Sequence, residues 1–513
     1  MITFSPGGLI WRESCMVRLC QMFLILLSVS WHNVIAQSSI TVTFSSELLP
    51  ENSLWFTNPP DSSAIPYRLS RQPALFWQQQ KPDQGQIIIL DDQDVKQSLL
   101  GIGASFEATT VYALRKNKSD DEIKRVLRAL VDPVKGIGLN LFRLTIGTSD
   151  FSDGRSLSEH PQGFYSYQDH PDQPFSIEKD IELGIIDIIQ KAQEVAAMLD
   201  PPQKLLFFAS CWSPPAWMKT SGQLVGGTLK PGYADSLAIY YRHFIEAYHE
   251  QGIEIYAITL QNEPRFSPRT YPGMVLTWDQ ELEVALAVHE QWKLLDARGI
   301  KPPKIWIHDH NFNGWVDADS ILCSLERMNK KDIVDGVAFH NYESYPIDSL
   351  MVLQSRHPDK RLLFSEKSEF GVKGMSNIVE YFRHGFSSYN AWVTMSTQTL
   401  DEHNQGPYNT LDMLSPTMLI QKDGTTSEWY VTPEYYLLGQ FAKFIRPGSQ
   451  RIACDPGDPL TVTALAVKRP DNRQVLILVN QTNKEQPVRV NQNEQWFEDH
   501  IPPKSVATFM WMP

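Results

Sequence analysis

The chain has 513 residues, of which 42% are hydrophobic and 20% are charged. This composition excludes a disordered protein, and the length exceeds that of one ordinary domain. The formal net charge of −13 argues against a nucleic-acid partner, because nucleic acids bind basic surfaces.

The first 36 residues have the layout of a secretory signal peptide. Arg12 and Arg18 precede an apolar run from Leu19 to Val29, and Ala36 ends a Val-Ile-Ala motif suited to cleavage. The run is shorter than the roughly 20 residues that span a bilayer, which favours a cleaved signal peptide. A membrane anchor that is not cleaved is the alternative. We therefore expect an exported protein, secreted, periplasmic or lysosomal according to its source.

Extended segments flank the central part of the chain. In residues 37–97, Ile40–Phe44 alternates in polarity and Gln86–Leu90 is a β-branched run. After about Pro433 the pattern returns to alternating strands joined by turns. Because the early strands would otherwise lack partners, we expect residues 37–97 to join residues 433–513 in one all-β, sandwich-like domain. Its later strands are expected at residues 460–467, 474–479, 487–490 and 505–511.

Residues 98–432 alternate between short apolar strands and amphipathic helices, which indicates parallel strands with right-handed crossovers. Eight such units predict a (β/α)8 barrel. An open, doubly wound sheet is the alternative, but Gly101–Phe106 lacks the third glycine of a phosphate-binding loop. The expected helices include Asp120–Val131, Ile177–Met198, Tyr233–Gln251 and Asp279–Arg298. The expected strands are Gly101–Phe106, Leu139–Ile146, Lys204–Cys211, Glu254–Leu260, Lys304–His308, Gly336–His340, Arg361–Phe364 and Tyr389–Met395.

Two acidic residues follow buried strands of this barrel. Glu263 comes after the fourth strand, between Asn262 and Pro264, and Glu366 comes after the seventh. Enzymes with this fold keep their chemistry at the C-terminal ends of the strands. Two carboxylates that face one sugar can hydrolyse a glycoside with retention, one attacking the anomeric carbon and the other protonating the leaving oxygen. Glu369 is the alternative nucleophile.

Six motifs in sequence order carry a resemblance to glycoside hydrolase family 30, the family of glucosylceramidase-like enzymes. It extends from about residue 98 to the C-terminus, and it implies that Glu263 is the acid/base and Glu366 the nucleophile. The motifs are Gly101-Ile-Gly-Ala-Ser-Phe, Phe142-Arg-Leu-Thr-Ile-Gly-Thr-Ser-Asp-Phe, Ala209-Ser-Cys-Trp-Ser-Pro-Pro-Ala-Trp-Met-Lys-Thr, Leu260-Gln-Asn-Glu-Pro, Phe364-Ser-Glu and Tyr389-Asn-Ala-Trp.

The resemblance also implies roles around these two acids. Asn262 would bind the sugar 2-hydroxyl, Arg143 would keep the nucleophile ionised, and Asp150 would hold a hydroxyl of the terminal sugar. The remaining implied residues are the pocket walls Trp212 and Trp392, and His340 and Tyr342 beside the nucleophile.

Three features depart from the family pattern or admit another reading. Glu107 directly follows Phe106, where the family often has an acid one residue later, so its contact with the sugar stays open. His308 and His310 flank Asp309 and could be a metal pair, but no third ligand is suitably spaced. We instead expect Asp309 and His310 to line the cleft through hydrogen bonds. The five cysteines, Cys15, Cys20, Cys211, Cys323 and Cys454, show no disulfide framework, although a bridge between Cys323 and Cys454 stays open.

The sequence therefore predicts an exported retaining β-glycosidase that acts on β-glucosides and needs neither a metal nor an organic cofactor. Its partner would be a carbohydrate or a glycolipid, with transient contact to a membrane surface in the glycolipid case. An endo-acting β-1,6-glucanase or xylanase of the same family is the closest alternative. A sugar-binding barrel without catalysis is the alternative from another class of protein.

Overall fold

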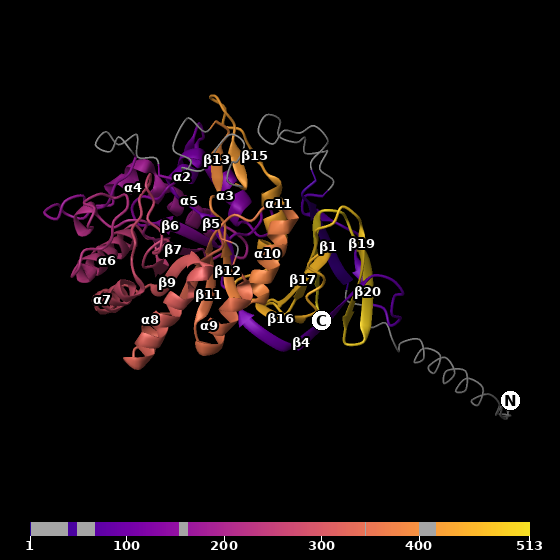
Figure 1. Cartoon of the computed structure of the whole chain (residues 1–513). Coiled ribbons are helices and arrows are strands. Elements are labelled where there is room, and N and C mark those ends of the chain that lie inside the picture. The colour runs from indigo at the N-terminus through magenta and orange to yellow at the C-terminus, as the bar shows by residue number, and fades with distance from the viewer. Residues whose placement is uncertain (2–38, 49–66, 153–162, 344, 400–416) are drawn as a thin grey trace.

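The computed structural model of the protein describes residues 1, 39–48, 67–152, 163–343, 345–399 and 417–513 (Figure 1). Apart from Met1, the expected signal peptide lies outside the described residues. Within the described part of the chain, no helix is both long and apolar enough to cross a membrane.

Eight parallel strands close into a barrel, which confirms the predicted fold (Figure 1). All eight overlap the expected segments, the eighth by two residues only. The eighth was expected at Tyr389–Met395 but begins earlier, because its serines gave no apolar signal although the whole strand is buried. The barrel strands are β5 (Gly101–Ser105), β6 (Leu141–Thr145), β7 (Leu206–Ser210), β8 (Ile255–Thr259), β9 (Lys304–Asn311), β10 (Gly336–His340), β11 (Arg361–Glu366) and β12 (Phe386–Asn390).

Helices cover the outside of the barrel and follow their local sequence signals. Ser119 and Glu122 form a reciprocal capping box at the start of the helix Asp120–Val131, which lies between the first two barrel strands. The helix expected over Ile177–Met198 is divided at Gly184, whose φ of 82° is left-handed and ends a helix. The helices are α2 (Ala108–Arg115), α3 (Asp120–Val131), α4 (Glu178–Leu183), α5 (Ile185–Ala197), α6 (Ala234–Glu250), α7 (Trp278–Asp296), α8 (Trp315–Arg327), α9 (Leu350–Arg356), α10 (Gly371–Arg383) and α11 (Pro433–Ala442).

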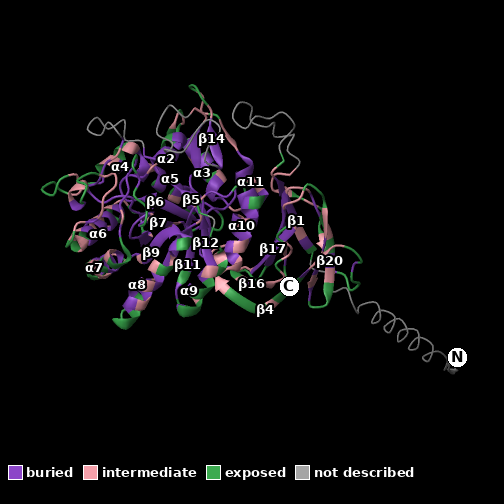
Figure 2. Cartoon of the chain, in the orientation of Figure 1, coloured by how far each residue is buried: buried purple, intermediate pink, exposed green. Residues whose placement is uncertain are grey.

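The barrel interior is filled with apolar side chains from neighbouring strands. One compact cluster contains Leu141, Phe208, Ala257, Trp306 and Leu363, one residue from each of five strands. Figure 2 shows the strands buried and the exposed residues on the outer faces of the surrounding helices. This apolar cluster fills the barrel interior beneath the C-terminal ends of the strands. Polar side chains at those ends therefore lie above a closed core and not above an open pore.

A second domain is built from both ends of the chain, as predicted (Figure 1). Its first strand pairs with its last along six consecutive positions, and β4 pairs with β16 on one side and with β19 on the other. Its own core includes Ile40, Val42, Leu476 and Phe509. The strands are β1 (Ser39–Ser46), β2 (Ser70–Arg71), β3 (Leu75–Phe76), β4 (Gln86–Ser98), β16 (Gln450–Cys454), β17 (Val462–Lys468), β18 (Gln474–Asn480), β19 (Gln486–Gln492), β20 (Gln495–Ile501) and β21 (Ser505–Trp511).

Two features between the barrel and the β-domain differ from the sequence expectation. Helix α11 occupies Pro433–Ala442, where an all-β region was expected, and nine of its ten residues are buried. A three-stranded sheet of β13 (Met395–Thr397), β14 (Leu419–Gln421) and β15 (Trp429–Val431) follows the last barrel strand. The apolar residues after β12 therefore belong partly to this small sheet.

Candidate active site

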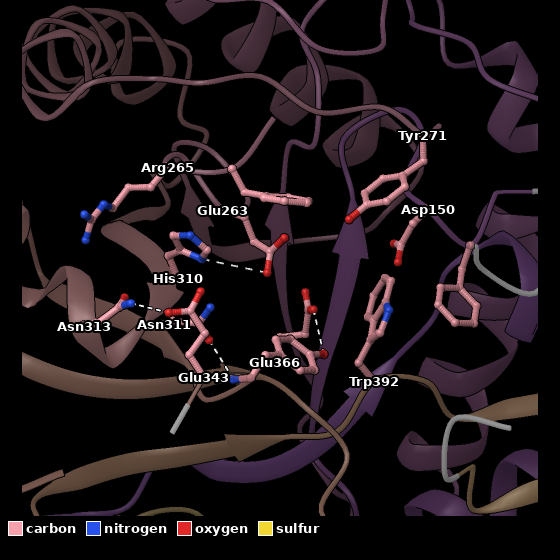
Figure 3. A pocket seen from close by; sticks show the side chains of 13 residues that line it. Asp150, Glu263, Arg265, Tyr271, His310, Asn311, Asn313, Glu343, Glu366 and Trp392 are labelled. Carbon is pink, nitrogen blue, oxygen red and sulfur yellow. Dashed lines mark hydrogen bonds and ion pairs between the residues drawn. The ribbon is translucent and has the colours of Figure 1, made fainter. Parts of the chain in front are cut away.

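A cavity of about 530 Å³ opens at the C-terminal ends of the barrel strands (Figure 3). Side chains at or after the C-terminal ends of β6, β8, β9, β10, β11 and β12 all reach it, so the residues converge although they are far apart in the sequence. The lining residues are Asp150, Phe151, Glu263, Arg265, Phe266, Tyr271, His310, Asn311, Asn313, Tyr342, Glu343, Glu366 and Trp392.

Glu263 reaches this cavity from the segment after β8. Its backbone has a φ of 49°, a left-handed conformation that a non-glycine residue adopts at some energetic cost. Its amide donates to the carbonyl of Asp309, which ties the segment to the neighbouring strand. Oε1 of Glu263 lies 3.4 Å from Nδ1 of His340 and 3.8 Å from Nδ1 of His310. The backbone strain thus serves to hold one carboxylate beside two imidazoles.

Glu366 ends β11 and is held by two donors. Nη1 of Arg143 lies 2.5 Å from its Oε2, and the hydroxyl of Tyr342 lies 2.9 Å from its Oε1. Both contacts favour the ionised carboxylate. The alternative nucleophile, Glu369, instead accepts hydrogen bonds from Tyr381 and Asn377 and does not line the cavity. Of the two candidates, only Glu366 is placed to meet a substrate.

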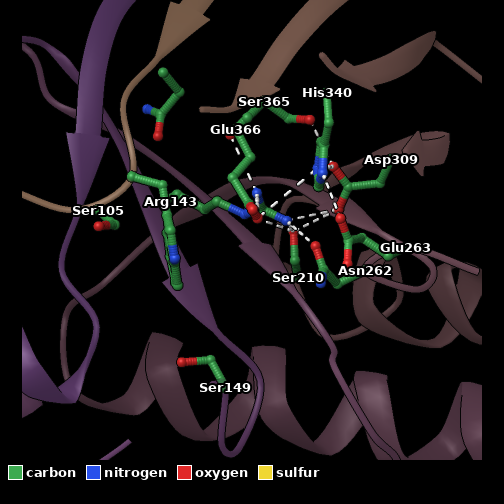
Figure 4. Close-up of polar contacts among 12 residues, drawn as sticks. Ser105, Arg143, Ser149, Ser210, Asn262, Glu263, Asp309, His340, Ser365 and Glu366 are labelled. Atoms are coloured by element: carbon green, nitrogen blue, oxygen red, sulfur yellow. Dashed lines mark hydrogen bonds and ion pairs between the residues drawn. The ribbon is translucent and has the colours of Figure 1, made fainter. Parts of the chain in front are cut away.

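Arg143 on β6 is the centre of a buried polar network under the cavity (Figure 4). Its Nη2 lies 2.8 Å from both Asn262 Oδ1 and Asp309 Oδ2, and its Nε lies 3.1 Å from Ser210 Oγ. Arg143 and Asp309 are both fully buried. A buried guanidinium is stable only when paired, and here Asp309 and Glu366 supply two negative charges. The network therefore fixes Glu366 from below.

Asp309 lies at an irregular point of the barrel. Across the pair of β9 and β10, His308 faces Ala338 and His310 faces Phe339, so Asp309 is the extra residue of a bulge. His308 and Asp309 both have left-handed φ values, 77° and 45°. The bulge turns Asp309 inward, where it accepts from Arg143, His340, Ser210, Thr259 and Ser365.

The burial of Asp309 corrects the expectation that it lines the cleft. Burial alone would raise the pKa of its carboxyl, but the charge of Arg143 and the hydrogen bond from His340 hold the pKa well below its usual range. Asp309 is thus a permanent anion beneath the site.

His340 joins Glu263 to this anion. Its Nε2 lies 3.0 Å from Asp309 Oδ1, so Nε2 carries a hydrogen, and its Nδ1 faces Glu263. A contact between Nδ1 and Glu263 requires a second proton, which resides either on the imidazole or on the carboxyl. Although burial lowers it, the charge of Glu366 and the hydrogen bonds to Asp309 and Glu263 raise the pKa of His340 to about 9. At neutral pH, Glu263 and His340 therefore hold one transferable proton between them.

The two cavity carboxylates respond to this arrangement in opposite ways. Burial raises the pKa of Glu263, but the hydrogen bond and the charge of His340 outweigh burial and lower it below the ordinary value. Burial raises the pKa of Glu366, and the negative charge of Glu263 adds to that rise against the opposing charges of His340 and Arg143. Because Arg143 and Tyr342 both donate to Glu366, we assign the negative charge to Glu366 and the shared proton to the side of Glu263.

Asp150, Tyr271 and Trp392 gather on one side of the two glutamates (Figure 3). Trp392 stacks on Trp212 with ring centroids 5.1 Å apart, and Phe151 meets Trp392 edge-on. Trp212 is 2% exposed and lies behind Trp392, so it supports the wall that it was expected to form. Burial, followed by the charges of Glu366 and Glu263, raises the pKa of Asp150 well above its usual range. Apolar rings beside a carboxyl suit the faces and hydroxyls of a sugar.

The opposite side of the cavity was not found from the sequence. Arg265, Asn313 and Glu343 lie there (Figure 3), with Phe266 also lining the cavity, and Asn313 donates to Glu343. Arg265 and Glu343 lie on loops and Asn313 in a single 3-10 turn, where no strand or helix period indicates which side chain faces inward. Glu343 and Phe266 are exposed, so this side opens toward solvent.

Three other candidates have structural contacts. Glu107 is fully buried and caps α2 by accepting from the amide of Thr110, and it does not line the cavity. Asn262 directs its amide oxygen to Arg143. The ring of His308 contacts the carbonyl of Asn311 and packs on Phe339, whereas His310 lines the cavity.

The structure also bears on the possible metal site and the possible disulfide that the sequence left open. Glu263, His310 and His340 lie close enough to share a cation, but hydrolysis by two carboxylates requires none. Cys323 and Cys454 are both free, so the bridge that the sequence left open is not formed.

The barrel and its paired carboxylates define a glycoside hydrolase. The profile of the glycosyl hydrolase family 30 TIM-barrel domain matches residues 99–445, and that of the glycosyl hydrolase family 30 beta sandwich domain matches residues 448–509. The chain belongs to glycoside hydrolase family 30, and it is a glycosidase that acts on a carbohydrate substrate.

Relatives of this chain differ in the activities that their names state. It is 24% identical over 458 residues to lysosomal acid glucosylceramidase of Mus musculus, covering 83% of this chain and 84% of that protein. It is 27% identical over 371 residues to endo-1,6-beta-D-glucanase of Neurospora crassa, covering 69% and 72%. The crystal structure of SrfJ from Salmonella typhimurium has the same fold, with a TM-score of 0.76, 22% identity and coverage of 93% and 100%.

Proposed function

We propose that this glycosidase hydrolyses β-glucosides with retention, and that its substrate is a glucosylceramide-like glycolipid. The observation that carries the proposal is the division of charge in one cavity. Glu366 accepts from Arg143 and Tyr342, whereas Glu263 faces the protonated side of His340. A nucleophile and an acid in these states are the two groups that double displacement requires.

In the first step, Glu366 attacks the anomeric carbon, and the bond from that carbon to the leaving oxygen breaks. Glu263 delivers the proton shared with His340 to the leaving oxygen, which departs as an alcohol. In the second step, Glu263 removes a proton from water, and the resulting oxygen nucleophile displaces Glu366. The sugar leaves with its original configuration, and the site regains its proton.

The two sides of the cavity support a glycolipid substrate. Trp392 and Phe151 wall one side and would hold a single sugar ring. Phe266 and Tyr342, which also line the cavity, are 39% and 49% exposed, so they offer apolar surface to an aglycone entering from a membrane surface. The mouse relative is named a glucosylceramidase, and its alignment covers 83% of this chain. The alignment with the endo-1,6-beta-D-glucanase relative covers 72% of that protein, which makes β-1,6-glucan the competing substrate. Xylan is the further alternative considered from the sequence.

Mechanism-based labelling tests the chemistry. An activated 2-deoxy-2-fluoro-β-glucoside should add one glycosyl mass to the peptide that contains Glu366, and Glu366→Gln should abolish the label. A matched variant, Glu369→Gln, should still be labelled, because Glu369 lies outside the cavity. A label on another residue, or inversion of configuration observed by NMR, would overturn the proposed mechanism.

A substrate panel tests the specificity. Hydrolysis rates are compared for an aryl β-glucoside, glucosylceramide with detergent, β-1,6-glucan and xylan. We expect release of glucose from the first two. Faster release of oligosaccharides from β-1,6-glucan or xylan would reject the glycolipid assignment and leave the retaining mechanism intact.

We also propose that residues 1–36 direct export. The supporting pattern is the basic segment, apolar run and Ala36 described above. Expression in the native host followed by N-terminal sequencing should give a mature chain that starts at Gln37. A chain that keeps Met1 and stays with the membrane would support the uncleaved anchor.

A further inference from the structure

A second cluster of ligand-type side chains lies outside the barrel, away from the catalytic cavity. Asp319 and Cys323 are four residues apart on α8, so they share one face of that helix. His357 ends α9 as its C-cap residue and meets both. The helices pack against each other, and Figure 1 shows them side by side at one edge of the barrel.

The three donor atoms surround one point. Nε2 of His357 lies 3.0 Å from Oδ1 of Asp319, and Sγ of Cys323 lies 3.9 Å from each of those two atoms. Bonds of about 2.0–2.3 Å to a tetrahedral zinc ion would separate such donors by roughly 3.4–3.6 Å. Each spacing therefore needs to change by only about 0.4 Å. A catalytic Cys-His-Asp relay would place the carboxylate and the thiol on opposite ring nitrogens, whereas here both meet Nε2.

Charge and burial also suit a metal ion. A carboxylate and a thiolate together would balance the charge of Zn²⁺. Nη1 of Arg356 lies 2.6 Å from Oδ2 of Asp319, which orients the carboxylate while leaving Oδ1 directed at the cluster. Asp319 is 8% and His357 is 7% exposed, while Cys323 is only partly buried, so an ion has an entry path from solvent.

We propose that Asp319, Cys323 and His357 form a zinc-binding site that joins α8 to α9. On binding, the Cys323 thiol loses its proton to solvent as the zinc–sulfur bond forms, and the imidazole hydrogen moves from Nε2 to Nδ1. A solvent molecule completes the tetrahedron. In the sequence, α8 precedes β10 and α9 comes after the segment that carries Tyr342, so the ion would steady one wall of the catalytic cavity without taking part in catalysis.

Cobalt(II) substitution tests this site directly. The full-length protein is stripped with a chelator and titrated with Co²⁺, while the near-ultraviolet thiolate-to-cobalt band and the visible bands are recorded. We expect one ion per chain, a charge-transfer band, displacement by Zn²⁺ and a rise in Tm. Cys323→Ser should lose the charge-transfer band, and His357→Gln should weaken binding at least tenfold. Cys454→Ser is the matched control and should bind normally.

Alkylation gives a second readout that does not depend on how the variants fold. Iodoacetamide modification of the wild-type protein is followed by peptide mass analysis with and without Zn²⁺. Zinc should slow modification of Cys323 at least tenfold and leave that of Cys454 unchanged. The absence of both a thiolate band and protection of Cys323 would overturn the proposal. Binding that survives Cys323→Ser but is lost in Glu263→Gln would place the ion in the catalytic cavity instead, and would also overturn it.

Discussion

Nδ1 of His340 lies 3.4 Å from Oε1 of Glu263, and the other nitrogen of the same ring is committed to the buried anion Asp309. The imidazole therefore cannot turn away from Glu263 without breaking a charged contact. A proton held between these two groups is available to a leaving oxygen in the cavity. In the mechanism proposed above, Glu263 acts as the acid through this partnership, even though His340 lowers the pKa of Glu263 itself.

Removing the acid should affect substrates according to their leaving groups. Glu263→Gln leaves the shape of the cavity but cannot donate the proton. We expect kcat/KM for a substrate with an alkyl leaving group to fall by about 10²–10⁴-fold, the range of general acid catalysis. Activated aryl glucosides need little protonation and should lose far less in the first step. Steady-state kinetics on both substrates measures the contrast.

Glu343→Gln is the matched control for that experiment. Glu343 lines the same cavity but lies on the side of Asn313 and contacts neither imidazole in the contacts described. Both substrates should be affected alike and only modestly. If Glu263→Gln slowed the two substrates by equal factors, Glu263 would not be the acid.

The pH dependence should report the shared proton. The pKa of His340 is about 9, so kcat/KM should fall as the pH rises through that value and the proton is lost. The free energy of unfolding should also fall as the pH rises. His340 gains a proton more readily in the folded protein, so its contribution is complete below a pH of about 6.5 and disappears as the pH approaches 9.

His340→Gln tests this assignment. The glutamine can still donate to Asp309 but holds no titrating proton beside Glu263, so the alkaline limb of the rate profile should move and the loss of stability between about pH 6.5 and 9 should diminish. Rate profiles and thermal melts across pH give both readouts. An alkaline limb that stays in place in the variant would assign that limb to another group.

The sequence predicted the parts of the site that depend on regular strands. Glu263 and Glu366 could be located because each comes at or just after the end of a short buried strand, whereas the role of Arg143 came from the family resemblance. The inward turn of Asp309 could not be predicted, since it depends on a bulge that adds a residue to β9 and reverses which side chain faces the cavity. Tyr271 was missed for a related reason, because it comes from a loop without a period.

The errors in the predicted secondary structure also occur where the sequence lacks a regular pattern of polarity. Helix α11 was missed because its buried residues lie on nearly all sides, which removes the amphipathic pattern. The strand β12 was displaced because Ser387 and Ser388 are buried polar residues in the barrel wall. Burial that contradicts residue polarity is set by neighbouring elements, and one strand's sequence does not contain that information.

Trp392 should bind a sugar hydroxyl through its indole N–H. Its side chain is 4% exposed, and among the described residues no acceptor lies within hydrogen-bond distance of that N–H. Trp392→Phe keeps the stack on Trp212 but removes the donor. We expect kcat/KM for glucosides to fall about three- to tenfold, which corresponds to one neutral hydrogen bond of about 0.5–1.5 kcal/mol.

Deoxygenated substrates identify that contact. A series of aryl glucosides, each lacking one hydroxyl, is assayed with the wild type and with Trp392→Phe. One member of the series should show no further loss in the variant. Trp212→Phe is the control, because Trp212 lies behind Trp392 and should affect every substrate equally. Additive losses across the whole series would exclude a hydrogen bond from Trp392.

Glu281 should position Asp309 from behind the barrel. It lies in the first turns of α7, is 2% exposed, and accepts a hydrogen bond of 2.8 Å from the amide of His308 at the bulge. Glu281→Leu would leave that amide without its acceptor, at a cost of about 1–3 kcal/mol in the free energy of unfolding. Because the bulge sets the place of Asp309, kcat should fall more than KM rises.

Glu281→Gln separates positioning from charge. Its amide oxygen can still accept from His308, so kcat should recover, whereas loss of kcat in both variants would show that the bulge does not depend on this acceptor. Burial raises the pKa of Glu281 to about 8, so the folded protein binds this proton more tightly than the unfolded chain, whose carboxyl titrates near 4.3. Wild-type stability should therefore decline as the pH rises between these values. Glu281→Gln has no such proton, so thermal melts should show that the variant gains stability relative to the wild type as the pH approaches 8.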